Sequence, residues 1–411
     1  MHFNDIRSYP SWPAFLAIGF AAAALLAFGP LNPPGGPVAP TAKPLAEIEP
    51  RIAISATNTP GDNDATPSLF KISQPGSYYL TGNITGVVGK HGIEIASSGV
   101  TLDLNGFDLA GVAGMGNFIG VFATGNAVNN ITIRNGSLRD WGGAGIDLSS
   151  SGAVNCSIVD VRAAGNAGRG VAVFTGCSIS GCVANANLGI GIVTSVGCVV
   201  SGCAAYDNTG SGFSLGSGCT ISGCSAYSND ASGIVTASGA TITGCSAYSN
   251  TLNGIDTSVA CTIASCAAYS NSGIGIDTSN GCVISGCTAR SNTLDGIRVS
   301  SSCIVTGNAC SANGNGAGDG AGIHATGSDN RIEGNTCGLA DRGIDIDASG
   351  NLIIRNSCSG NTTDWDIAAN NTYGPIIDRR IPAPIASTPA VVGTSATSTL
   401  GTTDPNANFT Y

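Results

Sequence analysis

The most constraining feature of the sequence is a repeat of 21 residues that runs without gaps through the middle of the chain. From Gly176 the chain reads GCSISGCVANANLGIGIVTSV, and five further copies follow in direct succession, the last being GCVISGCTARSNTLDGIRVSS. A related copy precedes them from Asn155, and looser copies begin at Ser302, Asp329 and Gly350. A unit this short cannot bury its own apolar side chains, so the copies must stack on one another as a solenoid.

Within each unit, apolar and polar residues alternate, which is the pattern of short strands with one buried face. Positions 2 and 4 are apolar, as at Cys177 and Ile179; position 17 is Ile, Val or Phe, and position 19 is Thr, Leu or Val. Glycine at positions 6 and 16 and asparagine at position 12 indicate turns. The pattern therefore predicts an all-β fold, a parallel β-helix with coils of about 21 residues and about three short strands in each coil.

Asparagine recurs in phase at position 12 of the repeat. A single asparagine is a common turn former, but that does not explain eight in the same position. We expect an inward ladder whose amides bond to turn backbone groups and to each other from coil to coil. The members are Asn166, Asn187, Asn208, Asn229, Asn250, Asn271, Asn292 and Asn313.

All 16 cysteines fall in the repeats, mainly at positions 2 and 7. In the last units position 7 becomes asparagine, and cysteine moves to position 9 as Cys310, Cys337 and Cys358. This exchange conserves inward volume and favours buried thiols, because cysteine packs as a small hydrophobe. Disulfides between stacked coils remain an alternative in an exported protein, and a thiolate metal stack is a third.

The chain is predicted to be organised in four segments. Residues 1–29, with the apolar run from Pro13 to Gly29, are either a cleaved export signal or an uncleaved membrane anchor. Residues 30–50 are a linker rich in Pro, Gly and Ala. Residues 51–375 form the β-helix, and residues 376–411 are a Pro/Ser/Thr-rich tail or cap. The folded part is therefore expected outside the cytoplasm, as a secreted, periplasmic or surface-tethered protein.

The charge of the chain limits its partners. Its formal net charge is −10, with 16 lysines and arginines in 411 residues. This composition argues against a nucleic-acid partner, which needs a basic surface. Contact with a membrane is expected only through the N-terminal segment, and no cofactor is required by any motif.

The repeat resembles that of the right-handed parallel β-helix proteins of the pectate-lyase-like superfamily. The segment PGSYYLTGNITG, from Pro75 to Gly86, and the following VTLDLNGFDLAG are similar to the opening coils of exported bacterial members. The resemblance covers about residues 70–370 and implies a right-handed coil. It implies a choice of activities, because the superfamily includes polysaccharide lyases, hydrolases, epimerases, tailspikes and non-catalytic surface proteins. The sequence motifs of polygalacturonases and pectate lyases are absent.

Position 18 is predicted to point outward and carries charge in the last third of the stack. Neighbouring carboxylates can act as acid and base on a glycosidic bond or hold Ca²⁺, as Asp256 and Asp277 would. An arginine can clamp a uronate, and a histidine can move a proton. An insertion around Asn315 to Ala321 could wall a cleft beside them. The alternative is a solvated face. The candidate catalytic residues are Asp256, Asp277, Arg298, His324 and Asp345.

Position 10 forms a second outward column, which is aromatic. Exposed aromatic rows can bind sugar rings, because a ring face is apolar while the hydroxyl is polar. The alternative is that the rings only stabilise the ladder by stacking. The candidate carbohydrate-binding residues are Tyr206, Tyr227, Tyr248, Tyr269 and Arg290.

The sequence thus predicts an exported or surface-tethered β-helix protein that is non-catalytic and either binds polysaccharide or cell-envelope glycan or builds the envelope. One alternative is a polysaccharide lyase or glycoside hydrolase that uses the charged column. The other is an adhesin or a self-assembling rod.

Overall fold

The computed structural model describes residues 49–125, 128–314, 320–379 and 403–411. The chain divides into two units, Met1–Pro50 and Arg51–Tyr411. The predicted export segment, nearly all of the linker and most of the insertion after Gly314 lie outside the described residues. Within the described part, no helix is long and apolar enough to span a membrane.

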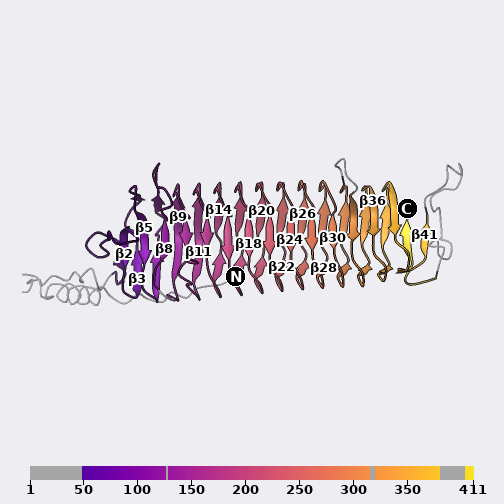
Figure 1. Ribbon diagram of the computed structural model, residues 1–411, viewed down its shortest axis with the longest axis horizontal. Coiled ribbons are helices and arrows are strands. Elements are labelled where there is room, and N and C mark those ends of the chain that lie inside the picture. The colour runs from indigo at the N-terminus through magenta and orange to yellow at the C-terminus, as the bar shows by residue number, and fades with distance from the viewer. Residues whose placement is uncertain (1–48, 126–127, 315–319, 380–402) are drawn as a thin grey trace, which may run out of the picture. The chain divides into compact units, whose positions relative to one another are not determined.

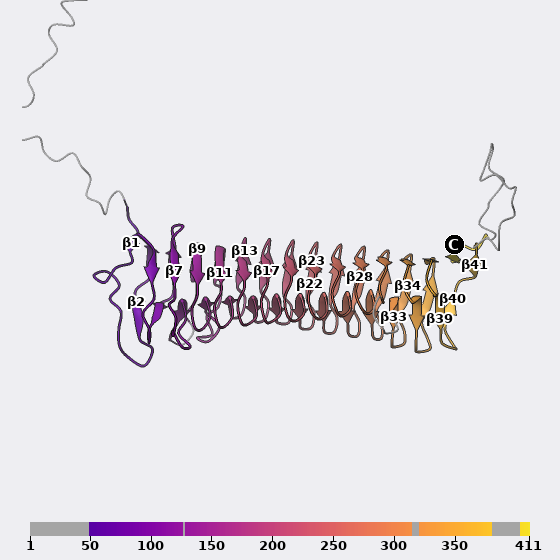
Figure 2. The same ribbon diagram turned by 90° about the horizontal axis from the view of Figure 1, so that it is seen from above.

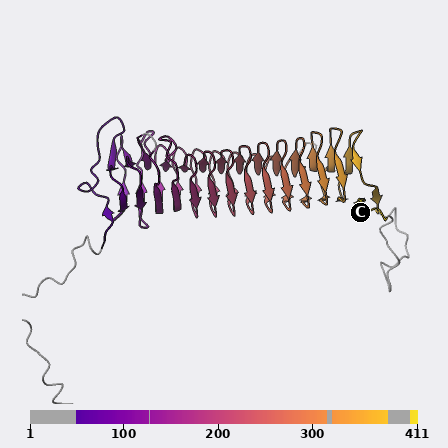
Figure 3. The same ribbon diagram turned by 90° about the horizontal axis from the view of Figure 1, so that it is seen from below.

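The unit Arg51–Tyr411 is a stack of parallel coils in which the chain advances steadily from one end to the other (Figure 1). Its strands form two sheets, of 28 and 14 strands, seen as separate rows in Figures 2 and 3. Strands one coil apart pair in parallel, and in the regular coils the partners are 21 residues apart, as for Ile179 and Val200. The predicted right-handed parallel β-helix is confirmed, with about fourteen coils.

Each regular coil contributes two strands to the larger sheet and one to the smaller. In the first regular coil these are β13 (Ser178–Ser180) and β14 (Val183–Asn185), then β15 (Ile192–Thr194). The smaller sheet, here called sheet B, carries the position-18 side chains on its outer face. It consists of β2 (Ser68–Ile72), β5 (His91–Ile95), β8 (Val121–Ala123), β10 (Ile146–Asp147), β12 (Val171–Ala172), β15, β18 (Phe213–Leu215), β21 (Ile234–Thr236), β24 (Ile255–Thr257), β27 (Ile276–Thr278), β30 (Ile297–Val299), β33 (Ala321–Ala325), β36 (Arg342–Ile346) and β39 (Thr363–Ile367).

Left-handed residues make the corners of each coil. Gly176, Gly181 and Ala186, at positions 1, 6 and 11, have φ of 65°, 63° and 53°. The residue after each corner points inward and belongs to a ladder. Position 16, which the sequence assigned to a turn, has a different role: a Cβ on Gly191 would lie 2.6 Å from the carbonyl oxygen of Gly212. This glycine is required by the close approach of neighbouring coils.

The asparagine ladder is continuous and buried. The backbone N–H of Asn166 donates to Oδ1 of Asn187 at 3.1 Å. The Asn187 amide in turn donates to the carbonyl of Ala163 at 3.1 Å and to Oδ1 of Asn208 at 2.9 Å. Each asparagine therefore satisfies backbone groups of the preceding coil, as predicted.

The cysteine ladders make the same bonds as the asparagines. The backbone N–H of Cys182 donates to Sγ of Cys203 at 3.4 Å, and that thiol donates to the carbonyl of Ile179 at 3.7 Å. Where the ladder changes residue type, the N–H of Cys287 donates to Oδ1 of Asn308 at 2.8 Å. The exchange of cysteine for asparagine thus conserves hydrogen bonds as well as volume. All sixteen cysteines are buried free thiols, so no disulfides form between coils.

The C-terminal residues close the stack. Strand β42 (Asn408–Thr410) lies between β38 (Ser357–Ser359) and β41 (Ile376–Asp378) and pairs with both. Asn408 extends an asparagine ladder by accepting the backbone N–H of Asn356 at 2.9 Å. The indole N–H of Trp365 donates to Oγ1 of Thr410 at 2.7 Å. The last residues therefore continue the solenoid beyond residue 375.

Candidate functional site

Sheet B places the predicted position-18 residues in one column. The strand register aligns Asp256 with Asp277, then Arg298, His324 and Asp345 on successive coils. Asp366 extends the column by one more coil. The structure therefore brings all five candidate catalytic residues together. Their partners divide them into an open group, which is Asp256, Asp277 and Arg298, and a closed group, which is His324 and Asp345 with the side chains that pair with them.

The open group lines a shallow pocket of about 370 Å³, here called the Arg298 pocket. Its walls combine charged side chains with hydroxyl groups from the turn that follows each sheet B strand. The lining residues are Asp256, Thr257, Asp277, Thr278, Ser279, Arg298, Val299, Ser300 and Thr326.

An ion pair organises this pocket. Arg298 donates through Nε to Oδ1 of Asp277 at 3.0 Å and through Nη2 to Oδ2 at 2.7 Å. The Asp277 carboxylate is one cause of a raised pKa of Arg298. Burial, together with the charge of Asp277, raises the pKa of Asp256. This pair uses two of the five N–H groups of Arg298, and the carboxylates of Asp256 and Asp277 beside it disfavour the negative charge of a uronate. A Ca²⁺ ion between Asp256 and Asp277 would compete with this pair, and the calcium site stays a prediction.

The closed group surrounds His324. Its Nδ1 lies 3.1 Å from Oδ2 of Asp295, and its Nε2 lies 3.0 Å from Oδ2 of Asp347 and 3.8 Å from Oδ2 of Asp345. Burial opposes the charged imidazole, but these carboxylates outweigh it and raise the pKa of His324 to about 9. The imidazole is therefore an ion-paired cation at neutral pH, which leaves it no free nitrogen to act as a base.

The carboxylate of Asp345 is also held in an ion pair. It is 5% exposed and accepts a bond from Nη1 of Arg342 at 3.0 Å, while Nε of Arg342 binds Asp366 at 2.9 Å. Donor atoms of His324, Asp345 and Asp347 lie within 4.8 Å of one another, as metal ligands could. Because these groups already neutralise one another, we assign them no metal.

At the N-terminal end of the position-18 column, the acidic side chains are buried, whereas the sequence predicted that this position is exposed. Glu94 is 1% exposed, and Asp147 is also buried. Segment 62–68 covers Glu94, which binds Nζ of Lys71 at 2.9 Å and the hydroxyl of Ser68 at 3.3 Å. Asp147 accepts the hydroxyls of Ser149 and Ser150, in the turn that follows it, at 2.7 and 2.8 Å, so both carboxylates are parts of the packing.

The tyrosine column is present on the larger sheet, with rings stacked face to face. Successive centroids of Tyr206, Tyr227, Tyr248 and Tyr269 are 4.7, 4.9 and 4.8 Å apart, with planes within 6° of parallel. Arg290 follows Tyr269 in register. Since each inner ring has neighbours on both faces, the column presents ring edges and hydroxyls outward. Sugar binding by this column stays a prediction.

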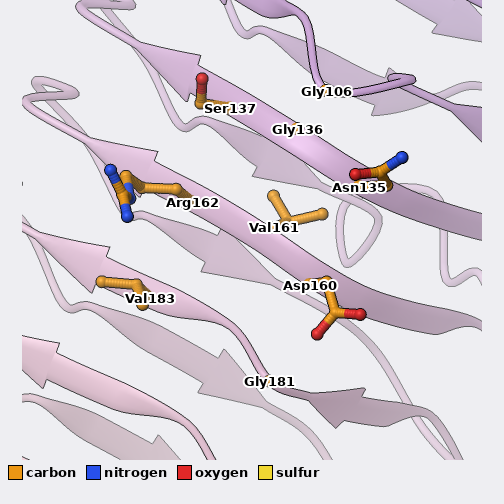
Figure 4. Close-up of a pocket in the computed structure, with 9 residues that line it drawn as sticks. All are labelled: Gly106, Asn135, Gly136, Ser137, Asp160, Val161, Arg162, Gly181 and Val183. Carbon is orange, nitrogen blue, oxygen red and sulfur yellow. The ribbon is translucent and has the colours of Figure 1, made fainter.

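Another hollow, of about 280 Å³, lies on the larger sheet in coils that sequence analysis did not single out. Figure 4 shows Asp160 and Arg162 on strand β11 (Ser157–Ala164), with Asn135 and Ser137 on the neighbouring β9 (Thr132–Arg139). Among the described residues, neither Asp160 nor Arg162 makes an ion pair. Asp160 and Arg162 stand at positions 6 and 8 of their unit, where the 21-residue units that follow carry no charge, so no column of charge marked them in the sequence.

Comparison with known proteins agrees with the fold. A family model for a right handed β-helix region matches residues 119–261, and one named periplasmic copper-binding protein (NosD) matches residues 236–378. The A-module of the Azotobacter vinelandii mannuronan C-5 epimerase AlgE6 is 16% identical, over 72% of this chain and 89% of that one, with a TM-score of 0.50. The receptor-binding domain of the siphovirus 9NA tailspike is 11% identical, over 78% and 75%, with a TM-score of 0.50. No curated protein sequence matches the chain.

The coil geometry and these matches define the class of protein. The chain is a right-handed parallel β-helix protein, and the pectate-lyase-like superfamily suits it. At such low identity the solved structures establish the fold alone.

The name of the second family model raises the question of copper. Within residues 236–378 the nitrogen and oxygen donors near His324 are held by ion pairs, and the thiols are held in the ladders. Copper prefers imidazole, tetragonal nitrogen and oxygen, or thiolate ligands that are free to coordinate it. The residues described there do not fit a preformed copper site.

Proposed function

We propose that this protein is an extracytoplasmic, non-catalytic β-helix that binds a neutral polysaccharide on sheet B. The observation that carries the proposal is the Arg298 pocket, an open polar hollow whose hydroxyls and carboxylates suit the hydroxyl groups of sugars. Polar groups of this kind, placed in a concave site, give a ligand its orientation. The pocket contains two carboxylates, those of Asp256 and Asp277, and one guanidinium, that of Arg298. This local excess of negative charge and the net charge of −10 of the chain both disfavour a polyuronate.

The state of the charged side chains supports binding over catalysis. His324 has a carboxylate on each ring nitrogen, and both oxygens of Asp277 hold Arg298. A general base needs an unprotonated atom within reach of the substrate proton. His324 offers none without first breaking an ion pair, and both oxygens of Asp277 already accept hydrogen bonds from Arg298 and Asn253.

The comparisons support a glycan partner and a location outside the cytoplasm. The epimerase module is named for mannuronan, the tailspike domain for receptor binding, and the NosD model for a periplasmic protein. The apolar run from Pro13 to Gly29 is consistent with export.

The test uses the purified full chain on immobilised neutral glucans and mannans, with a polyuronate for comparison. We expect retention on a neutral polysaccharide, and Arg298→Gln to weaken it about tenfold, because one charged contact is worth that much. Arg331→Gln is the matched control, since Arg331 is an exposed arginine on the other sheet that pairs with Glu333. Absence of retention, or an equal loss in both variants, would refute the proposal.

A polysaccharide lyase or hydrolase is the second candidate, favoured by one observation. Burial raises the pKa of Asp256 while the adjacent Asp277 is held as an ion pair, and such a divergence marks acid and base pairs in many enzymes. Release of reducing ends or unsaturated uronates by the wild-type chain, lost in Asp256→Asn, would establish it. We expect no turnover.

A further inference from the structure

A second pocket lies on the outer face of sheet B, near the N-terminal end of the stack. Its volume is about 460 Å³, and nothing in the repeat pattern indicated it. Two ring side chains form one wall: His91 stacks on Phe122 with centroids 4.1 Å apart and meets the edge of Phe118 at 4.8 Å. Hydroxyl side chains form much of the rest. The lining residues include Thr66, His91, Phe122, Thr124, Ser150 and Ser151.

The position of the His91 proton follows from a backbone contact. Nδ1 of His91 accepts the N–H of Ile119 at 3.0 Å, so this nitrogen carries no proton. Burial lowers the pKa of His91, so the ring is neutral at neutral pH. A neutral imidazole with an accepting Nδ1 must bear its proton on Nε2. His91 therefore brings one N–H donor to the pocket, and that N–H has no partner among the described side chains and backbone.

Three hydroxyls of the pocket have their protons directed away from it, toward carboxylates. Thr124 donates to Oε1 of Glu94 at 2.5 Å, and Ser150 donates to Oδ2 of Asp147 at 2.8 Å. Thr66 donates to Oδ1 of Asp64 at 3.1 Å. A hydroxyl that donates its proton keeps its oxygen as an acceptor. Ser151 likewise donates to the carbonyl of Leu148 at 3.4 Å, so the pocket offers four hydroxyl acceptors and one donor beside the rings.

We propose that this pocket, here called the His91 pocket, is a subsite for one neutral sugar unit. Sugar hydroxyls would donate to the oxygens of Thr124, Ser150 and Thr66, and one ring or hydroxyl oxygen would accept from Nε2 of His91. The apolar C–H face of the sugar would pack against the half-buried ring of His91, which covers the buried Phe122. The carboxylates behind the hydroxyls disfavour an anionic sugar, and the N–H of His91 disfavours a simple cation.

The two pockets of sheet B lie in line along the stack. Phe122 is on β8 and Asp256 on β24, six strands further along the sheet, and strand spacings of about 4.8 Å place them about 29 Å apart. Between them the column holds Asp147, which is buried and accepts the hydroxyls of Ser149 and Ser150, and then the uncharged Ala172, Val193, Ser214 and Val235. One polysaccharide chain running along the stack can reach both pockets. This last step rests on the proposed function, whereas the His91 pocket itself does not.

The test measures binding of maltotriose, cellotriose and mannotriose to the full chain by calorimetry, since a trisaccharide is too short to reach both pockets. We expect one of these to bind, and Thr124→Val to weaken it about tenfold by removing one acceptor at constant shape. Ser150→Ala is the second variant, because it leaves the buried Glu94 cluster intact. The matched control is Thr241→Val, an exposed threonine on the other sheet.

The outcomes separate this inference from the proposed function. A loss in both pocket variants, with the control and Arg298→Gln unchanged, supports the His91 pocket even if polysaccharide retention fails. Wild-type affinity in Thr124→Val and Ser150→Ala overturns it. So does a loss in Arg298→Gln alone, which would place the trisaccharide in the Arg298 pocket. Absence of binding of every trisaccharide to the wild-type chain also overturns it.

Discussion

The two ends of the position-18 column occupy the same place in the coil but have different surroundings. At the N-terminal end, Glu94 is buried beneath segment 62–68 and holds the hydroxyls of Ser68 and Thr124. In the last third, Asp256, Asp277 and Arg298 line an open pocket. The difference shows that position within a repeat decides the direction of a side chain, whereas chain from outside the repeat decides its exposure. Four predictions test this contrast.

The largest effect is expected at the covered end. Glu94→Ala leaves the hydroxyls of Ser68 and Thr124 without their acceptor and removes one of the three carboxylates that bind Lys71, which together cost about 3 kcal/mol of unfolding free energy. Asp277→Ala should cost at most about 1 kcal/mol, because the partner Arg298 is 40% exposed. Hydrogen exchange of the amides in β5 and β27 would measure local stability. Equal losses at both ends would remove the distinction between them.

The closed group should make stability depend on pH. The folded-state pKa of His324 is raised from 6.5 to about 9 by Asp295, Asp347 and Asp345. Its contribution is thus fully present below pH 6.5 and is lost as the pH rises through about 9. We expect a loss of up to about 3 kcal/mol across this range. Thermal melting from pH 6 to 10 would show it, and His324→Gln should flatten the curve; a wild-type curve that is already flat would contradict the network.

A smaller effect is expected on the larger sheet. Tyr248→Ala removes a ring stacked on both faces, and such cross-strand pairs contribute about 1 kcal/mol or less. Because the ring faces are covered, glycan retention should not change. A loss of retention at unchanged stability would instead support sugar binding by the tyrosine column.

The smallest effect concerns the open pocket. The Arg298 charge lowers the pKa of Asp256 and so opposes the larger effects of burial and Asp277. Arg298→Gln should therefore raise the pKa of Asp256 further. Carbon-13 NMR of the carboxyl would report the change, with Arg331→Gln as control. An unchanged or lower value would mean that the two residues do not share one pocket.

Much of the fold followed from the repeat alone. A period of 21 residues predicts which residues become neighbours on adjacent coils, and Asp256, Asp277 and Arg298 are aligned as that arithmetic requires. The insertion and looser units after Ser302 did not disturb the column, because His324 and Asp345 keep their phase relative to the inward apolar residues. Whether a side chain points inward or outward depends on the alternation of residues near it in the chain, so the sequence predicts it.

The partners of those residues were not predictable in the same way. His324 meets Asp295 and Asp347, which lie in the loops before and after sheet B strands of neighbouring coils and belong to no column. The His91 pocket depends on Thr66 and Ser150, which come from segments outside the regular units. No periodicity links such residues, and only the folded chain places them together.

By itself, the sequence determined the coil, its parallel stacking and the inward ladders of asparagine and cysteine. These depend on alternation and on a repeat length, which are properties of residues near one another in the chain. Only the tertiary structure decided which charges are open to a ligand, which are neutralised in pairs, and how Asn408 enters the stack beside Asn356. Those outcomes depend on contacts between distant segments, where burial and electrostatic pairing are set by the whole fold.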